Sequence, residues 1–375
     1  MVKNGTSGKK RLGVFNSLVL AFNLAFAISL ALSYLSVHIS PERNWILPFF
    51  GLLYPYLVLV NLFFMIYWML RKRWLFLLSA IVLISGWNHV ERTIQFQGQD
   101  EVPADRKAIK LLSYNVKNLS NDNVHLIDPK VREKILSFID GEDPDILCLQ
   151  EFAVIHPDPE LFIDTLSVRL NMPYHAHSHY FKKSKKGIDA IIIFSKFPIL
   201  DFDSVKKDNI QNYAMYTDLL IGTDTARVFN IHLESFRFKH EDYSFLSELD
   251  LQFKEDENLK ESSYRIFNKV RTAFSRRAAQ VDYLASLIAE SPYPVILCGD
   301  FNDTPNSYSY QQLSARLQDA FIESGSGLGN TYFGNLPSYR IDYILYDDYY
   351  TSAGFRRVLV KYSDHYPVSC LVYKR

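Results

Sequence analysis

A short apolar stretch that leads directly into acidic and amide residues constrains this chain most. Residues 295–305 are Val-Ile-Leu-Cys-Gly-Asp-Phe-Asn-Asp-Thr-Pro. An apolar run this short, rich in β-branched residues, predicts a strand buried on both faces. Gly299 allows the backbone to turn at the end of the strand. Ligands of open α/β sheets lie at the carboxyl ends of strands, so Asp300, Asn302 and Asp303 are candidate site residues, with a simple turn as the alternative for Asp303.

Other apolar runs of the chain are also flanked by polar residues. A single Asn or Asp at a strand end is usually a turn residue. A whole series of them, with Glu and two His included, indicates that polar side chains line one rim of a sheet. The series comprises Asn115, Glu151, His232, Asp342, Asp364 and His365.

Residues 108–375 show short strands alternating with helices, the pattern of an α/β domain. Asp128 followed by Pro129 predicts the start of a helix that ends near Gly141. Residues 235–263 are highly charged and predict an exposed, partly helical insertion. The lysines at 182–186 predict a basic loop. We expect strands at 109–116, 146–149, 189–195, 213–221, 226–232, 339–346 and 366–373, and helices at 160–170 and 267–290.

The first 94 residues have a different character. No Asp, Glu, Lys or Arg occurs within 12–37, 45–70 or 74–90. At ~1.5 Å per residue, each of the first two segments is long enough to cross a hydrocarbon layer of ~30 Å. Tryptophans near both ends of the third are typical of interface anchors. We therefore expect a membrane region at 1–94 with three transmembrane helices, a linker at 95–107 and a second domain at 108–375.

The basic residues of the short loops predict an orientation. Lys and Arg gather before the first apolar segment and again at residues 71–73, whereas the loop between the first two segments holds only Arg43. The positive-inside rule then places the N-terminus in the cytoplasm. With three spans, the second domain lies outside the cytoplasm; if the third segment does not span, this orientation inverts.

Charge and cysteine content narrow the function classes. Residues 105–375 hold 32 basic and 37 acidic residues, a net charge of −5, which argues against a tight, salt-sensitive nucleic-acid binder but not against a metal-dependent nuclease. The three cysteines lie in apolar runs and have no zinc or disulfide spacing, so we expect buried structural thiols.

The ordered set of strand-end residues resembles the endonuclease/exonuclease/phosphatase superfamily, which includes DNase I and the neutral sphingomyelinases. The resemblance covers about 108–375 and is closest to a bacterial, membrane-anchored member. It implies a four-layer α/β sandwich in which two mixed sheets face each other with helices outside. It also implies metal-dependent hydrolysis of phosphate esters.

The resemblance further implies roles for single residues. Glu151 would be the main ligand of Mg²⁺, or of Mn²⁺, supported by Asn115 and Asp364. His365 would be the general base, oriented by Asp342. Three more roles complete the set: Asp300 would orient or deprotonate the attacking water, Asn302 would hold a phosphate oxygen, and His232 would contact the phosphate or protonate the leaving group. Some relatives carry an acidic residue where this chain has Lys117, so we expect one metal rather than two.

The leading hypothesis is a nuclease-like phosphodiesterase in a bacterial inner membrane, with its catalytic domain outside the cytoplasm and its N-terminal helices in the bilayer. A phospholipid phosphodiesterase similar to the sphingomyelinases is the alternative, for which Phe236 and Phe238 are candidate apolar contacts. A catalytically silent binding domain is a third. The sequence points to no obligate protein partner.

Overall fold

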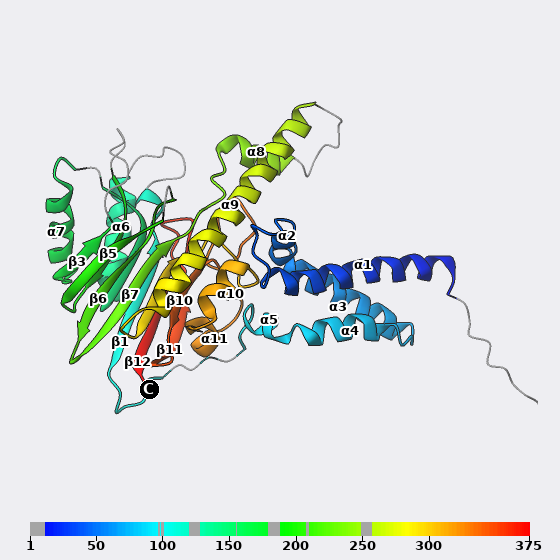
Figure 1. The fold of residues 1–375 in the computed structure, drawn as a ribbon, viewed down its shortest axis with the longest axis horizontal. Coiled ribbons are helices and arrows are strands. Elements are labelled where there is room, and N and C mark those ends of the chain that lie inside the picture. The colour runs from blue at the N-terminus through cyan, green and yellow to red at the C-terminus, as the bar shows by residue number, and fades with distance from the viewer. Residues whose placement is uncertain are drawn as a thin grey trace, which may run out of the picture.

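The computed structural model describes residues 12–96, 98, 101–119, 128–154, 156–178, 188–207, 210–248 and 257–375. Its centre consists of two six-stranded mixed sheets (Figure 1). The first has the order β11 (Tyr350–Arg357), β12 (Val368–Lys374), β1 (Ala108–Asn115), β2 (Ile146–Val154), β4 (Ile188–Ser195), β3 (Tyr174–His177). The second has the order β5 (Ile199–Lys207), β6 (Ile210–Ile221), β7 (Asp224–His232), β8 (Val295–Asp300), β10 (Asp342–Tyr346), β9 (Gln318–Asp319).

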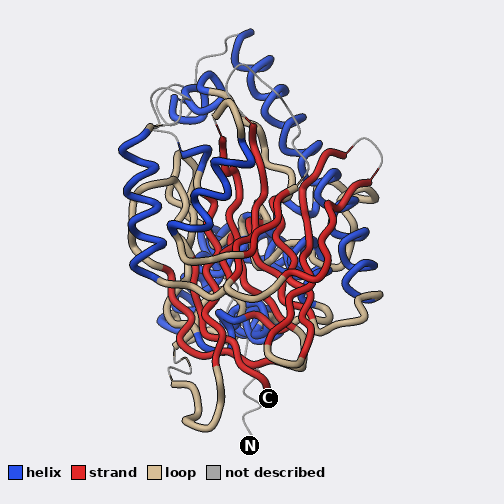
Figure 2. The backbone as a smooth tube through the Cα atoms, turned by 90° about the vertical axis from the view of Figure 1, so that its left-hand side faces the viewer, coloured by secondary structure: helices blue, strands red, loops and turns tan. Residues whose placement is uncertain are grey.

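The two sheets face each other across one apolar core. Its buried side chains alternate along the strands of both sheets, and Cys148, Cys298 and Cys370 are among them, as expected for structural thiols. Helices α6 (Pro129–Glu142) and α7 (Pro159–Arg169) pack on the outer face of the first sheet. Helices α9 (Glu257–Ala289) and α10 (Tyr308–Ser314) cover the outer face of the second. Figure 2 shows the strands between these outer helices, which confirms the expected facing mixed sheets.

Local signals explain where several elements begin. The side chain of Asp128 accepts hydrogen bonds from the amides of Lys130 and Val131 and so caps α6, as predicted. The helix ends one residue past Gly141, with Asp143 in the left-handed conformation. Helix α9 begins ten residues before the expected start, because part of the charged insertion joins it; α8 (His240–Glu248) is another part. The lysine-rich loop lies outside the described residues.

Gly299 lies inside β8 rather than at a turn after it. Its φ is +143°, and a Cβ there would lie 2.0 Å from the carbonyl oxygen of Ile231 on β7. The glycine is therefore needed for the close approach of two strands that carry site residues.

The N-terminal region differs from the three expected transmembrane helices. It forms α1 (Val14–Ser36), α2 (Leu47–Leu52), α3 (Tyr54–Leu70), α4 (Phe76–Ser85) and α5 (Trp87–Glu91). Among the described residues, α1 alone is both long and apolar enough to cross a membrane; α3 and α4 have 17 and 10 residues.

Two local features break the expected second and third spans. Pro55 lies in the first turn of α3 and cannot continue α2, because proline lacks an amide hydrogen. Gly86 separates α4 from α5, and its hydrogen in place of a Cβ lets the ring of Tyr34 approach. The prediction of three uninterrupted helices is therefore corrected to α1 plus shorter apolar helices.

Candidate active site

Strand register brings the predicted residues to one rim. Strands β1 and β2 run parallel and pair Asn115 with Gln150, one residue before Glu151. In the other sheet, Asp300 pairs with His232 on parallel β7 and with Asp342 on antiparallel β10. β12 runs antiparallel to β1, so the residues just before its start lie beside the end of β1. The rim therefore collects carboxyl ends of parallel strands and amino ends of antiparallel ones.

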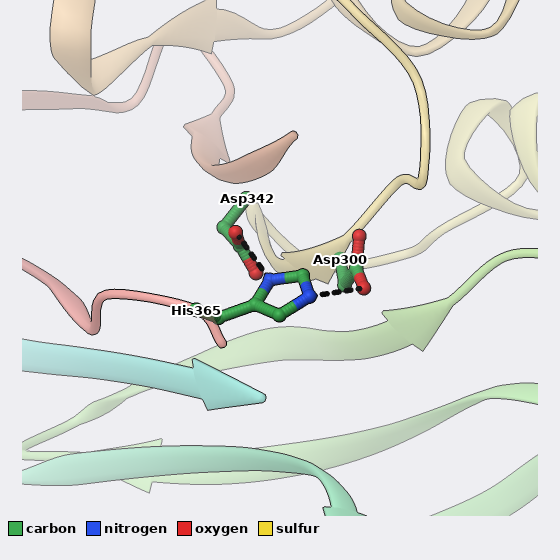
Figure 3. A group of neighbouring side chains, drawn as sticks. All are labelled: Asp300, Asp342 and His365. Atoms are coloured by element: carbon green, nitrogen blue, oxygen red, sulfur yellow. Dashed lines mark hydrogen bonds and ion pairs between the residues drawn. The ribbon is translucent and has the colours of Figure 1, made fainter. Parts of the chain in front are cut away.

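The centre of the site is a histidine between two carboxylates (Figure 3). Nδ1 of His365 lies 2.9 Å from Oδ2 of Asp342, and its Nε2 lies 3.8 Å from Oδ2 of Asp300. All three residues are at most 5% exposed. The ring of Tyr332 packs edge-on against the imidazole, with 5.4 Å between ring centroids. The histidine is thus fixed on one nitrogen by a carboxylate and directs the other towards Asp300.

Burial and charge act in opposite directions on the titration of this cluster. Burial lowers the pKa of His365, but the carboxylates of Asp342 and Asp300 outweigh it and raise the pKa to about 10. Burial raises the pKa of Asp300, and the neighbouring histidines only partly oppose this. Burial thus shifts Asp300 towards its neutral form, whereas the two carboxylates shift His365 towards its charged form.

Glu151 reaches the site through a local distortion of its strand. The register between β2 and β4 shifts between Leu149 and Phe152, and Glu151 within this irregularity has φ +48°. Such a conformation is costly for a residue with a Cβ and is common at functional sites. The amide nitrogen of Asn115 donates to Glu151 Oε1 at 3.2 Å and to Asp300 Oδ2 at 3.0 Å, so one side chain links both carboxylates.

His232 lies between the same two carboxylates. Its Nε2 is 3.3 Å from Glu151 Oε1 and 3.8 Å from Asp300 Oδ2. That nitrogen is buried, and its contacts with the two carboxylates are within ion-pair distance but do not form a hydrogen bond. A buried polar atom without a partner costs free energy, so a ligand oxygen at this point would be favoured.

Asn302 and Asp303 are held in different ways. The backbone amide of Asn302 donates to Asp300 Oδ1 at 2.7 Å, and its side chain donates to the carbonyl oxygen of Leu233 at 3.0 Å. Asp303 instead accepts from the buried Arg277 at 3.2 Å and from Ser309 at 2.8 Å. Asn302 thus faces the site, whereas Asp303 anchors the loop to α9 and α10.

Asp364 is paired with Lys117. Lys117 Nζ lies 3.0 Å from Asp364 Oδ2, and both side chains are partly exposed. The backbone amide of Lys117 donates to the side-chain oxygen of Asn115 at 3.0 Å. Lys117 is therefore part of the site.

The arrangement fits a divalent cation. Ligand atoms of Asp300, Asp342 and His365 all lie within 4.8 Å of one another, close enough for one ion. Glu151 and Asp364 add two more carboxylates, and hard cations such as Mg²⁺ prefer oxygen ligands. Burial is the largest cause of the raised pKa of Asp300, and the neighbouring carboxylate of Asp342 adds to it.

A cleft of about 790 Å³ is lined by Lys117, Glu151, Asp300, Asn302, Asp303, Asp364 and His365. Phe236 and Phe238, the candidate lipid contacts, also line it. The cleft is also lined by Tyr243 of α8 and by residues of α2 and α3. The sequence did not predict these contributions, because no local pattern shows which loops and helices meet in space. Tyr332, likewise missed, carries no signal in the sequence beyond its aromatic character.

Comparisons with known proteins agree with this architecture. A model of the endonuclease/exonuclease/phosphatase family matches residues 112–365. A model described only as a domain of unknown function matches residues 16–93. Protein angel of Drosophila melanogaster is 28% identical over 222 residues, 54% of this chain and 54% of that protein. The chain thus spans about half the length of the curated relative it matches.

Solved structures with similar folds are more distant. D. rerio TDP2 humanized by 14 mutations is 16% identical, with a TM-score of 0.49, covering 71% of this chain and 98% of that one. The human Nocturnin catalytic domain with bound sulfate is 17% identical, with a TM-score of 0.48, covering 72% and 98%. The assignment to a family therefore rests on the family model that matches residues 112–365, and not on these structures.

Proposed function

Because the chain belongs to the endonuclease/exonuclease/phosphatase family, we propose that it is a metal-dependent phosphoesterase that hydrolyses phosphodiester bonds. The observation that carries this proposal is the buried cluster of His365, Asp342 and Asp300, of which His365 and Asp300 line the cleft. Residues 108–375 are the catalytic domain in this proposal, 95–107 the linker and 1–94 the membrane region.

Hydrolysis joins a water oxygen to phosphorus and breaks one P–O ester bond. Asp300 would orient the water and accept its proton, because a buried carboxylate of raised pKa is an effective base. His365, predicted from the sequence as the general base and oriented by Asp342, would take that proton on from Asp300 or would contact the phosphate as a cation.

Two further residues would complete the reaction. His232, whose Nε2 is buried without a hydrogen-bond partner, would donate a proton to the departing oxygen or contact the phosphate. Asn302, beside Asp300, would hold a phosphate oxygen.

The cation would be held by Glu151, with Asp364 and Asn115 beside it. Mg²⁺ or Mn²⁺ bound there would withdraw electrons from phosphorus and neutralise charge on the phosphate oxygens. Asn115 positions Glu151 and Asp300 through its amide nitrogen. Lys117 occupies one oxygen of Asp364, which supports one metal rather than two. The group of Asp300, Asp342 and His365 is the alternative position.

The N-terminal helices would anchor the protein in a lipid bilayer. Their outer faces expose large apolar side chains, among them Phe22 (62% exposed), Phe63 (65%) and Ile81 (65%). Between the helices, polar groups pair with one another: Asn23 donates to Ser79 at 2.7 Å and accepts from Trp68 at 3.0 Å. Polar residues inside and apolar residues outside are typical of helices packed in lipid.

The expected orientation needs α4 and α5 together to supply a third crossing, although among the described residues α1 alone is long and apolar enough to span. Figure 1 places the start of α1 and the α3–α4 link at the end of the bundle that lies away from the sheets. Arg71, Lys72 and Arg73 lie in that link. A cytoplasmic location for this end would place the catalytic domain on the opposite side of the membrane. Placement in a bacterial inner membrane stays a prediction from the sequence.

The decisive experiment uses the full-length protein in detergent micelles. Bis(p-nitrophenyl) phosphate and supercoiled plasmid are incubated with Mg²⁺, with Mn²⁺ or with a chelator. We expect metal-dependent hydrolysis that is abolished by His365→Ala and by Asp300→Asn but retained by Asp201→Asn, an exposed carboxylate on β5. Folded protein without turnover on either substrate would contradict the proposal and favour a silent binding domain.

A further inference from the structure

The cleft that contains Asp300 and His365, where the phosphate ester would bind, also has a wall of apolar side chains. Three separate parts of the chain build this wall: the α2–α3 junction, helices α8 and α9, and the loop before β10. Its residues include Leu53, Tyr56, Leu246, Val270, Leu336 and Pro337. The same cleft is lined by Lys117, Glu151, Asp300 and His365. The polar site residues and the apolar wall therefore belong to one cleft.

The α2 side of the wall is attached to the catalytic domain by specific contacts. Phe49 on α2 stacks on Phe267 of α9 with 5.7 Å between ring centroids, and it meets Phe274 edge-on at 5.4 Å. The hydroxyl of Tyr339 donates to the carbonyl oxygen of Leu52 at 3.1 Å. Figure 1 shows α2 between the helical bundle and α9. The apolar wall is therefore continuous with the helices that carry the exposed apolar surface.

The charges of the cleft do not suit a chain of many phosphates. Among the described residues that line it, the lysine and arginine side chains are Lys117 and Arg237. Lys117 is paired with Asp364 at 3.0 Å, and Arg237 with Glu234 at 2.8 Å. A nucleic acid gains affinity by placing several phosphates against cations. An occupant with one phosphate ester and an apolar remainder matches these walls better.

We propose that the substrate is the phosphate ester of an amphiphile, whose hydrocarbon chain lies against the α2–α3 and α9 wall while its phosphate meets Asp300 and His365. This inference rests on the proposed phosphoesterase function and adds the class of substrate. Because the wall adjoins the apolar bundle, such a substrate would enter from the lipid layer that surrounds the bundle.

The test uses a series of p-nitrophenyl phosphodiesters whose second ester group is methyl, butyl or octyl. Release of p-nitrophenol by the full-length protein in one detergent gives kcat/KM for each member. We expect kcat/KM to rise by at least about 100-fold from methyl to octyl, because each buried CH₂ contributes to binding. Supercoiled plasmid is assayed in the same micelles.

Because the octyl ester also partitions into detergent, wall variants decide the source of the gain. Leu53→Gln and Leu336→Gln place an amide on two sides of the wall. Each should lower the octyl-to-methyl ratio about tenfold through loss of one leucine contact. The matched control is Leu161→Gln, an exposed leucine on α7, which should leave the ratio unchanged. Thermal melting of each variant shows that it is folded.

The outcomes separate the two proposals. Turnover of no diester and no plasmid would overturn the phosphoesterase function itself. Equal kcat/KM for the methyl and octyl esters would contradict an amphiphilic substrate. So would an octyl-to-methyl ratio that both wall variants retain. Neither result would contradict the phosphoesterase function. Plasmid cleavage that exceeds octyl-ester turnover would instead identify nucleic acid as the substrate. A ratio that falls in the folded wall variants and not in Leu161→Gln supports the inference.

Discussion

Oδ2 of Asp342 lies 2.9 Å from Nδ1 of His365, and both side chains are buried. A carboxylate in this position determines which imidazole nitrogen carries a proton, orients the ring and stabilises its charged form. Asp342 acts through His365, so it is a positioning residue, and its effect should be measurable apart from general stability.

Asp342→Asn should reduce kcat by roughly 10²–10⁴-fold with a smaller change in KM, because the amide can neither hold the proton in place nor stabilise the imidazolium. Steady-state kinetics on bis(p-nitrophenyl) phosphate measure this. The exposed Asp201→Asn serves as control and should keep both constants. A KM effect with unchanged kcat would show that Asp342 serves substrate binding only.

The stability of metal-free protein should depend on pH through His365. Its folded pKa is about 10 against an ordinary value of 6.5. The stabilisation is therefore fully present below pH 6.5 and is lost as pH rises through about 10, since the folded state then holds a proton that the unfolded state has released. Thermal melting in chelator between these limits should show this decline.

The same titration of Asp342→Asn provides the comparison. Without the carboxylate the pKa of His365 should lie lower, so the decline should be shallower. Identical slopes in the two proteins would mean that the pair does not determine this pH dependence.

Glu151→Gln should weaken metal binding by at least about 10–100-fold, a loss that even outer partners of metal ligands produce. Calorimetric titration with Mn²⁺ and the rise in melting temperature on adding Mn²⁺ both report it without an activity assay. Glu290→Gln, an exposed residue directly after α9, is the matched control. A greater loss in Asp342→Asn than in Glu151→Gln would place the ion between Asp300, Asp342 and His365 instead.

Arg340→Met should destabilise the fold by about 3–5 kcal/mol, because it leaves the buried carboxylate of Asp319 without its partner. Arg340 NH1 lies 2.7 Å from Asp319 Oδ2, with both side chains 1% exposed, and its NH2 donates to the carbonyl oxygen of Arg92. Denaturant unfolding in detergent measures the change. Arg356→Met removes an exposed pair with Glu142 and should cost about 0–1 kcal/mol. Equal costs for the two would contradict a special role for the buried pair.

Gly299→Ala should destabilise the sheet by about 1–3 kcal/mol, because its Cβ would overlap the carbonyl oxygen of Ile231. Gly141→Ala in α6 meets no atom within 4 Å and should be neutral or stabilising, because alanine favours a helix. Unfolding curves of both variants and of the parent protein test whether the free energy of unfolding falls in Gly299→Ala and stays the same or rises in Gly141→Ala.

Local sequence pattern was sufficient to predict most of the strands and helices of residues 108–375. Short apolar runs predicted the central strands, and Asp128 with Pro129 predicted the start of α6. The rim could also be inferred, because polar residues at the carboxyl ends of parallel strands meet at one edge. The N-terminal region was less predictable: composition identified its apolar segments, but Pro55 and Gly86 divide two of them into shorter helices.

The sequence by itself determined the α/β class, the order of the strands' polar ends and the residue types gathered for phosphate chemistry, since these follow from periodicity and from side-chain chemistry. Only the tertiary structure decided that Glu151 reaches the site from an irregular strand, that Lys117 pairs with Asp364, and that α2 and α3 wall the cleft. These are contacts between residues far apart along the chain, and they depend on how the layers and the bundle pack together rather than on any local preference.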